Sequence, residues 1–151
     1  MNLVLEPQIV HWPPTHYVFL EKIGPFMQTA PKAWQELHQL KHLIAEHNRI
    51  TGAMSLYKMK PDIYRAGFIL SEAAVELPSG LEYEEFTGGK YSKFVHTGSY
   101  LNLGPASGLV WEYVAKNDIL LRSDFAIENY ANDPQSTPEA ELITEILVPT
   151  V

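Results

Sequence analysis

Two stretches of the sequence match each other: Glu21-Lys22-Ile23-Gly24-Pro25-Phe26 and Val95-His96-Thr97-Gly98-Ser99-Tyr100. Each is an extended run that reaches a glycine, then a small residue and then an aromatic one. The match continues, with an offset of 74 residues at the glycines and 73 at the tyrosines, through Pro31 and Pro105, Leu37 and Trp111, Leu40 and Val114, and Tyr57 and Tyr130. Two copies are too few for a stacked repeat protein, which needs about three or more. They predict one pseudo-symmetric domain.

Each copy is predicted to form two strands, a helix and two more strands, which is an α+β pattern. After strand signals within the first ten or so residues, the expected strands are 17–23, 53–57, 63–70, 81–86, 91–97, 125–131 and 142–148. We expect a single domain over residues 1–151, with halves of about 1–75 and 76–151 joined by residues 71–80. No helix-turn-helix segment is expected before it.

The two helices are predicted from apolar residues at helical spacing. The first is expected to begin near Pro31 with Thr29 as its cap, and to end before Gly52. Its buried stripe is predicted to contain Trp34, Leu37, Leu40, Leu43 and Ile44. The second is expected from about Pro105 to Lys116, with its apolar positions at Leu109, Val110, Tyr113 and Val114.

Composition and charge exclude several classes of protein. The net charge is −7, and it divides into +1 for residues 1–75 and −8 for residues 76–151. An acidic half repels phosphate backbones, so we expect no direct nucleic-acid partner. The chain has no cysteine, no signal-peptide pattern and no apolar run long enough to cross a bilayer. We expect a cytoplasmic protein without a membrane contact or a cofactor.

The C-terminal region carries the most specific motif. It reads Glu128-Asn129-Tyr130-Ala131-Asn132-Asp133-Pro134, then Thr137-Pro138-Glu139, then Glu141-Leu142-Ile143-Thr144-Glu145-Ile146, then Pro149. This resembles the closing signature of the GyrI-like, or bacterial effector-binding, family. Gly89-Lys90-Tyr91 and the two glycine-centred stretches resemble the openings of the family's two halves, so the resemblance covers nearly the whole chain.

The resemblance implies a fold and a choice of functions. The family fold has two pseudo-symmetric halves that share an antiparallel sheet, with a ligand cleft between them. Its members include effector domains of multidrug-responsive regulators, a gyrase-inhibiting protein and hydrolases of cyclopropane-bearing alkylating compounds. The chain departs from the family at Ser107, where members often have an aromatic residue. Side-chain hydrogen bonds of Asn132 and Asp133, with the fixed φ of Pro134, are expected to shape a turn, and these residues are expected to take no part in chemistry.

Glu128 is the predicted centre of the site. The strand alternation places Glu128 and Tyr130 on the same face, and the resemblance implies that the glutamate lies in the ligand cleft. An apolar cleft with one carboxylate selects lipophilic cations, while aromatic side chains supply most of the affinity. The predicted ligand-binding residues are Glu128, Tyr130, Tyr57, Phe68, Trp111 and Tyr100. Trp34 is interpreted as core.

Other candidate sites are weaker. His38 and His42 have the i, i+4 spacing of a metal pair, but no acidic ligand stands at a diagnostic spacing, so we expect no metal site. His96 is either a hydrogen-bonding group of the pocket or a structural residue. Ser99 and Ser107 lack the context of a serine nucleophile. Gly88-Gly89-Lys90 lacks the spacing of a phosphate loop.

Three functions stay open at this point. The first is a module that binds an amphipathic, cationic small molecule for sensing or sequestration, with a separate protein to relay any signal. The second is a hydrolase of strained cyclopropane compounds in which Glu128 acts as catalytic acid or base. The third is an inhibitor that binds a protein partner through acidic residues such as Glu82, Glu84 and Glu85.

Overall fold

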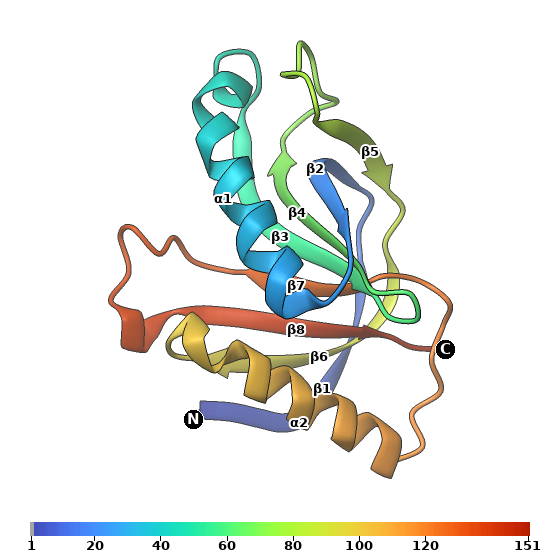
Figure 1. The fold of residues 1–151 in the computed structure, drawn as a ribbon. Helices are drawn as coiled ribbons and strands as arrows, with labels where there is room; N and C mark the ends of the chain where they lie inside the picture. The colour runs from blue at the N-terminus through green and yellow to red at the C-terminus, as the bar shows by residue number, and fades with distance from the viewer. Residues whose placement is uncertain (1) are drawn as a thin grey trace. The chain divides into compact units, whose positions relative to one another are not determined.

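The computed structural model describes residues 2–151 (Figure 1). Its elements, in chain order, are β1 (Asn2–Trp12), β2 (Thr15–Ile23), α1 (Phe26–Ala45), β3 (Ile50–Lys58), β4 (Ile63–Leu70), β5 (Glu82–Phe86), β6 (Gly89–Thr97), the short helix η1 (Tyr100–Asn102), α2 (Leu103–Lys116), β7 (Ala126–Tyr130), the short helix η2 (Glu139–Glu141) and β8 (Ile143–Pro149). The predicted α+β class, with a strand-strand-helix-strand-strand order that occurs twice, is confirmed. None of the helices in residues 2–151 has the length and apolar character needed to span a membrane.

The chain forms two compact units, which we call the terminal unit and the central unit. The terminal unit contains β1 and Gly89–Val151, and its strands lie in the order β1-β6-β8-β7. The central unit is Pro13–Gly88, and its strands lie in the order β3-β4-β2-β5. Neighbouring strands within each unit are antiparallel.

The compact units do not follow the halves of the sequence, because each half places its first strand in the other unit. β1 pairs with β6 in the terminal unit, while β5 pairs with β2 in the central unit. Both edges of β2 are occupied, by β4 and by β5, so β1 has no edge of β2 to join. Pro13 and Pro14 separate β1 from β2, and neither can donate a backbone hydrogen bond to a hairpin ladder.

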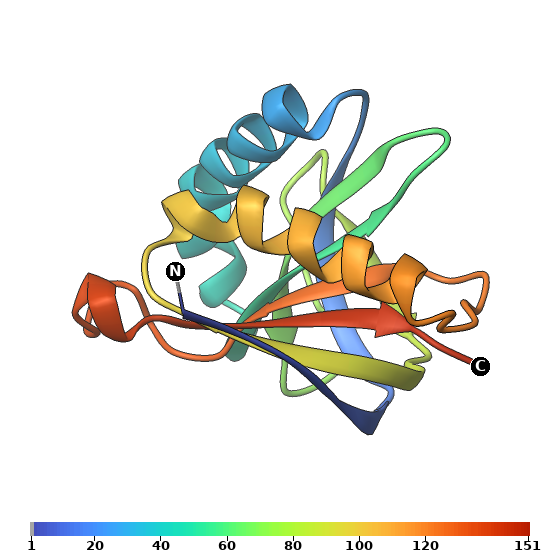
Figure 2. The same cartoon turned by 90° about the horizontal axis from the view of Figure 1, so that it is seen from below.

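In the terminal unit, α2 lies across one face of the sheet (Figure 2). Its buried positions repeat every three or four residues, at Leu103, Ala106, Val110 and Val114. Ala106, Val110 and Val114 pack with Phe94 of β6 and with Ile146 and Val148 of β8. The apolar residue Leu109 lies off this stripe and is 41% exposed.

In the central unit, α1 begins five residues before the predicted start. The amides of Gln28 and Thr29 both donate to the Pro25 carbonyl, at 2.9 Å each, which closes the first helical turn at Pro25. Thr29 therefore lies inside the helix and its hydroxyl donates back to Pro25, so its predicted role as cap is wrong. Leu37 and Ile44 are buried and Trp34 is half-buried, but Leu43 is 36% exposed, contrary to prediction.

The internal repeat is visible in matching local structures. Gly24 and Gly98 have φ angles of 134° and 127°, a region that favours glycine, and each ends a strand. Two residues further on, Phe26 lies edge-on to Tyr57, with ring centres 5.5 Å apart. Tyr100 lies edge-on to Tyr130 in the same way, at 5.4 Å. Each unit therefore builds the same aromatic pair between its glycine turn and the strand that follows its long helix.

Candidate functional site

Glu128 lies on β7 of the terminal unit, opposite Ile146 of β8. Its two carboxylate oxygens have different hydrogen-bond donors. The Tyr130 hydroxyl donates to Oε1 at 3.0 Å, and the Ser107 hydroxyl of α2 donates to Oε2 at 3.3 Å. The predicted placement of Glu128 and Tyr130 on one face of the strand agrees with this contact.

The environment of Glu128 disfavours its charged form. Burial raises the pKa of the carboxyl group, and the hydrogen bonds from Tyr130 and Ser107 offset part of that rise. The residue still keeps some solvent exposure. A carboxylate that is poorly solvated but accessible attracts a cation more strongly than a fully hydrated surface glutamate does.

Aromatic rings flank the carboxylate within the terminal unit. Tyr130 holds Glu128 through its hydroxyl, and the ring of Tyr100 stands edge-on to the Tyr130 ring. Burial raises the pKa of the Tyr100 hydroxyl, with a further contribution from the charge of Asp133. The structure thus brings together three of the predicted residues, Glu128, Tyr130 and Tyr100.

Trp111 lies one helical turn beyond Ser107 on α2. It packs against the buried cluster of Phe94, Val110 and Ile146. It also lines an apolar pocket of about 340 Å³ at the end of α2, whose other residues are Val114, Ala115, Asp118, Ile119, Leu120 and Leu121. In the terminal unit, Trp111 therefore has a packing role besides its predicted role as a ligand contact.

Tyr57 and Phe68 lie in the central unit, within an aromatic cluster beneath α1. Tyr57 is buried against Phe26. Phe68 is buried against Trp34, with ring centres 6.3 Å apart, and the ammonium of Lys41 lies 5.5 Å from the Phe68 ring centre. Both aromatic residues belong to the packing of this unit, and their contact with a ligand stays a prediction.

A neutral hydrogen-bond network in the same cluster was not predicted from the sequence. The indole Nε1 of Trp34 donates to the Tyr64 hydroxyl at 2.8 Å and to Ser55 Oγ at 3.2 Å. The hydroxyls of Ser55 and Tyr64 are themselves 2.6 Å apart. Trp34 is interpreted as core from the sequence, but it is half-buried, and its indole N–H donates to two buried hydroxyls.

The other candidates take structural places. His38 is exposed on α1 and lies against the rings of Trp34 and Phe68, at 5.6 and 5.9 Å. Burial lowers its pKa, and the charge of Lys41 lowers it further. Within residues 2–151, no group of three or more histidine, aspartate or glutamate side chains is arranged to hold a metal ion.

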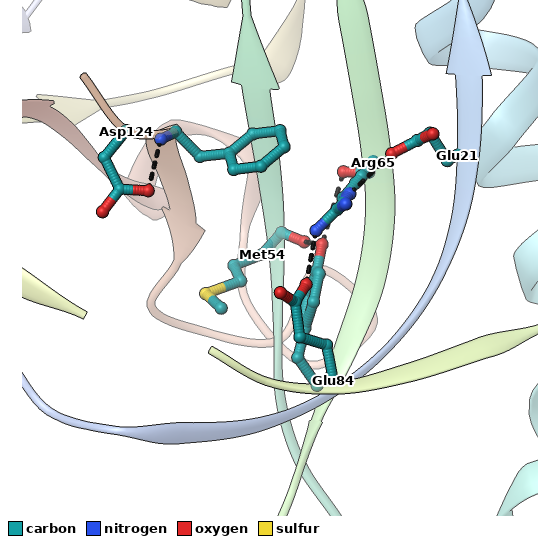
Figure 3. Close-up of polar contacts among 7 residues, drawn as sticks. Glu21, Met54, Arg65, Glu84 and Asp124 are labelled. Carbon is teal, nitrogen blue, oxygen red and sulfur yellow. Dashed lines mark hydrogen bonds and ion pairs between the residues drawn. The ribbon is translucent and has the colours of Figure 1, made fainter. Parts of the chain in front are cut away.

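The acidic strand β5 is partly neutralised. Arg65 of β4 donates to Glu21 of β2 at 2.8 Å and to Glu84 of β5 at 2.6 Å, as Figure 3 shows. Its guanidinium also lies 4.3 Å from the centre of the Phe19 ring. Glu84 is therefore engaged within the central unit, and the binding of a basic protein by this strand stays a prediction.

The turn after β7 has the shape that its sequence predicts. Asn132 Nδ2 donates to the Glu141 carbonyl at 3.0 Å, and Asn132 Oδ1 accepts from the Ile143 amide at 2.9 Å. Asp133 accepts from the Gln135 amide at 2.9 Å. These bonds fix the path from β7 to β8 and so the register that places Glu128 opposite Ile146.

The model of the GyrI-like small molecule binding domain matches residues 5–151 of the chain. The chain belongs to the GyrI-like family. As a GyrI-like domain it is a small-molecule-binding domain, and the resemblance inferred from its C-terminal motif is confirmed. Among curated proteins, none matches the sequence significantly.

Solved structures share the fold of this GyrI-like domain at low identity. The EcmrR C-terminal domain is 17% identical, with a TM-score of 0.79 and 97% of both chains covered. SAV2435 bound to tetraphenylphosphonium is 16% identical, with a TM-score of 0.74 and 97% and 94% covered. A hydrolase from Listeria innocua is 11% identical, with a TM-score of 0.62 and 97% and 92% covered. The domain spans only 58% of the EcmrR chain in its complex with DNA.

Ser107 is the functional candidate that sequence reasoning missed. In the sequence, Ser107 is marked only as a position that departs from the family pattern and as a serine that lacks the context of a nucleophile. Its helical position, three residues before Val110 of the buried stripe, directs its hydroxyl toward the strand that carries Glu128. A polar residue next to an otherwise apolar helix stripe is the signal that could have found it.

Proposed function

We propose that this GyrI-like domain binds lipophilic cations at Glu128. The observation that carries the proposal is the carboxylate itself, which is poorly solvated and held by Tyr130 and Ser107 in a residue that is only partly buried. A bound cation would compensate the negative charge of this carboxylate, which water solvates poorly. The structural neighbour SAV2435 was solved with tetraphenylphosphonium, a lipophilic cation, which supports the choice of ligand class.

The aromatic rings would supply most of the binding free energy. The rings of Tyr100 and Tyr130 can contact the apolar arms of a cation. Where a ring also faces the positive charge, the cation–π interaction contributes about 0.5–2 kcal/mol of binding free energy. The ion pair would add little net affinity, because the cation also loses its hydration. The carboxylate would therefore set the charge selectivity, and Tyr57, Phe68 and Trp111 are proposed as further aromatic contacts.

The biological role that we propose is sensing or sequestration of such compounds in the cytoplasm. The chain matches the C-terminal domain of EcmrR, whose full-length chain has been solved with DNA. The acidic charge of this chain disfavours direct DNA binding. A partner protein would therefore relay any signal.

A thermal-shift experiment with two ions of the same shape and opposite charge tests this proposal. Tetraphenylphosphonium should raise the Tm of the wild type by several degrees at about 100 times its Kd, which corresponds to about 2.7 kcal/mol. Tetraphenylborate should not. Glu128→Gln should lose the response, whereas Glu112→Gln, on the exposed side of α2, should keep it. Equal responses to both ions, or a response unchanged in Glu128→Gln, would contradict the proposal.

A second candidate function is hydrolysis at the same carboxylate. The raised pKa of Glu128 makes its carboxylate a stronger base than an ordinary glutamate. Glu128 would take a proton from water while the water oxygen bonds to a cyclopropane carbon. One ring C–C bond would break, and the proton would return to the departing carbon. Two structural neighbours from Listeria innocua are described as hydrolases. Turnover of a cyclopropane alkylator that is equally fast in Glu128→Gln would exclude this mechanism.

A further inference from the structure

Three residues of the terminal unit have buried polar atoms without a hydrogen-bond partner among residues 2–151. The atoms are both ring nitrogens of His96, the hydroxyl of Thr144 and the hydroxyl of Tyr100. His96 and Thr144 are completely buried. A buried polar group that stays unpaired destabilises the folded protein, so three residues with such groups in one unit point to a group that binds there.

The sheet register places His96 and Thr144 side by side. His96 of β6 is opposite Thr144 of β8, and Thr144 is in turn opposite Tyr130 of β7. Side chains of directly opposite residues lie on the same face, with Cβ atoms about 4.5–5.5 Å apart. His96 and Phe94 share a face because they are two residues apart, and Phe94 packs beneath α2. The row of His96, Thr144 and Tyr130 is therefore on the α2 side of the sheet.

Tyr100 is connected to this row through its contact with Tyr130. The ring of His96 reaches toward the turn at Gly98, because its Cε1 is 4.0 Å from the place where a Cβ of residue 98 would be. That turn leads into η1, where Tyr100 begins the helix and stands edge-on to Tyr130. Thr144 and Tyr100 thus both lie next to the tyrosine that holds Glu128, and His96 lies next to Thr144.

We propose that His96, Thr144 and the Tyr100 hydroxyl form a polar subsite that binds a neutral hydrogen-bonding group of the ligand, such as a hydroxyl or an amide. The neutral imidazole offers one donor and one acceptor, and each hydroxyl offers both. A ligand hydroxyl can satisfy two of these groups at once. The inference deepens the proposed function, on which it rests: the preferred ligands are lipophilic cations that carry a neutral polar arm.

Calorimetric titration of the full chain with matched cations tests the subsite. The probes are tetraphenylphosphonium and its derivatives with one hydroxymethyl group, at the meta or para position of one ring. In the wild type, one hydroxymethyl isomer should bind about three- to tenfold more tightly than the parent, the range of one net hydrogen bond. Thr144→Val and Tyr100→Phe should each reduce that ratio to below about twofold.

Thr150→Val is the matched control, because the buried Thr150 hydroxyl has a partner in Ser92. It should keep the wild-type ratio and lower the Tm, whereas Thr144→Val, which removes an unpartnered hydroxyl, should not lower it. Equal affinity of all the cations in the wild type, or a ratio unchanged in both subsite variants, would overturn the subsite alone. Binding of no cation, or binding unchanged in Glu128→Gln, would overturn the Glu128 site and the subsite with it.

Discussion

The terminal and central units carry the same aromatic pair but differ in the residue that stands two positions before its tyrosine. In the terminal unit this residue is Glu128, and in the central unit it is Ser55. Ser55 is completely buried and belongs to a neutral network with Tyr64 and Trp34. Glu128 has a carboxyl group of raised pKa, and buried groups nearby are unpartnered.

This difference indicates that the polar groups of the central unit serve stability and that those of the terminal unit serve binding. The central unit pairs the polar groups beneath its helix with one another, which is the arrangement that favours a stable core. The terminal unit keeps a poorly solvated carboxylate and unpaired groups, which are costs that folded proteins tolerate mainly at functional sites. Four sets of substitutions test this contrast, and each set is expected to have a smaller effect than the one before it.

The largest effect should come from placing the terminal unit's carboxylate in the central unit. Ser55→Glu buries a charge in a space that has no cationic partner in the neutral network, so it should destabilise the fold by about 3–5 kcal/mol. Denaturant unfolding measures the loss. The reciprocal change, Glu128→Ser, should cause no comparable loss. Equal losses for both changes would show that the two positions are equivalent.

Removal of a tyrosine hydroxyl should act differently in the two units. Tyr64→Phe leaves the Trp34 indole and the Ser55 hydroxyl without this partner and should cost about 1–3 kcal/mol. Tyr100→Phe removes a hydroxyl without a partner and should leave the free energy of unfolding unchanged or slightly higher. Chemical denaturation of both variants is the measurement. A similar loss in both would mean that the Tyr100 hydroxyl is already satisfied in the free protein.

The third effect depends on pH. The folded-state pKa of Glu128 lies above its usual value of 4.5, so its contribution to stability is full below that value and is lost as the pH rises through the folded pKa. Glu128→Gln should therefore have a Tm higher than that of the wild type at neutral pH. The difference should shrink as the pH falls toward 4.5. A difference that is constant with pH would contradict the raised pKa.

The smallest effect should come from Ser107. Its hydrogen bond lowers the pKa of Glu128, so Ser107→Ala should raise that pKa further. Tetraphenylphosphonium binding should then weaken at a slightly higher pH than in the wild type, by less than about 1 kcal/mol at any pH. Ser107→Thr keeps a hydroxyl and serves as the control. A lower pH midpoint in Ser107→Ala would show that the hydroxyl does not stabilise the carboxylate.

Much of the fold could be predicted from local sequence patterns. Strand alternation and glycine turns gave the order of the elements, and the period of two placed Glu128 and Tyr130 on one face. The exchange of β1 and β5 between the units could not be predicted, because strand pairing depends on which edges remain open after folding. Helical spacing alone also overestimated the width of the buried stripe of α1, as the exposed Leu43 shows.

The site was less predictable than the fold. Glu128, Tyr100 and Tyr130 come together because they lie on the glycine turn and the strand that follows the long helix, which the repeat locates. Ser107 and Thr144 reach the site from α2 and β8. Ser107 is marked only by its place beside the apolar stripe of α2, and the motif around Thr144 does not assign its side chain to the site. The sequence did not decide between a pocket role and a structural role for His96. Only the sheet register shows that it lies beside Thr144.

A crystal structure of the protein with tetraphenylphosphonium tests the central claim most directly. We predict the cation in the terminal unit beside the Glu128 carboxylate, with its phenyl arms against the rings of Tyr100 and Tyr130 and within about 6 Å of their centres. A cation bound elsewhere, for example in the pocket lined by Trp111 and Leu120, would contradict the assignment of Glu128 as the centre of the site.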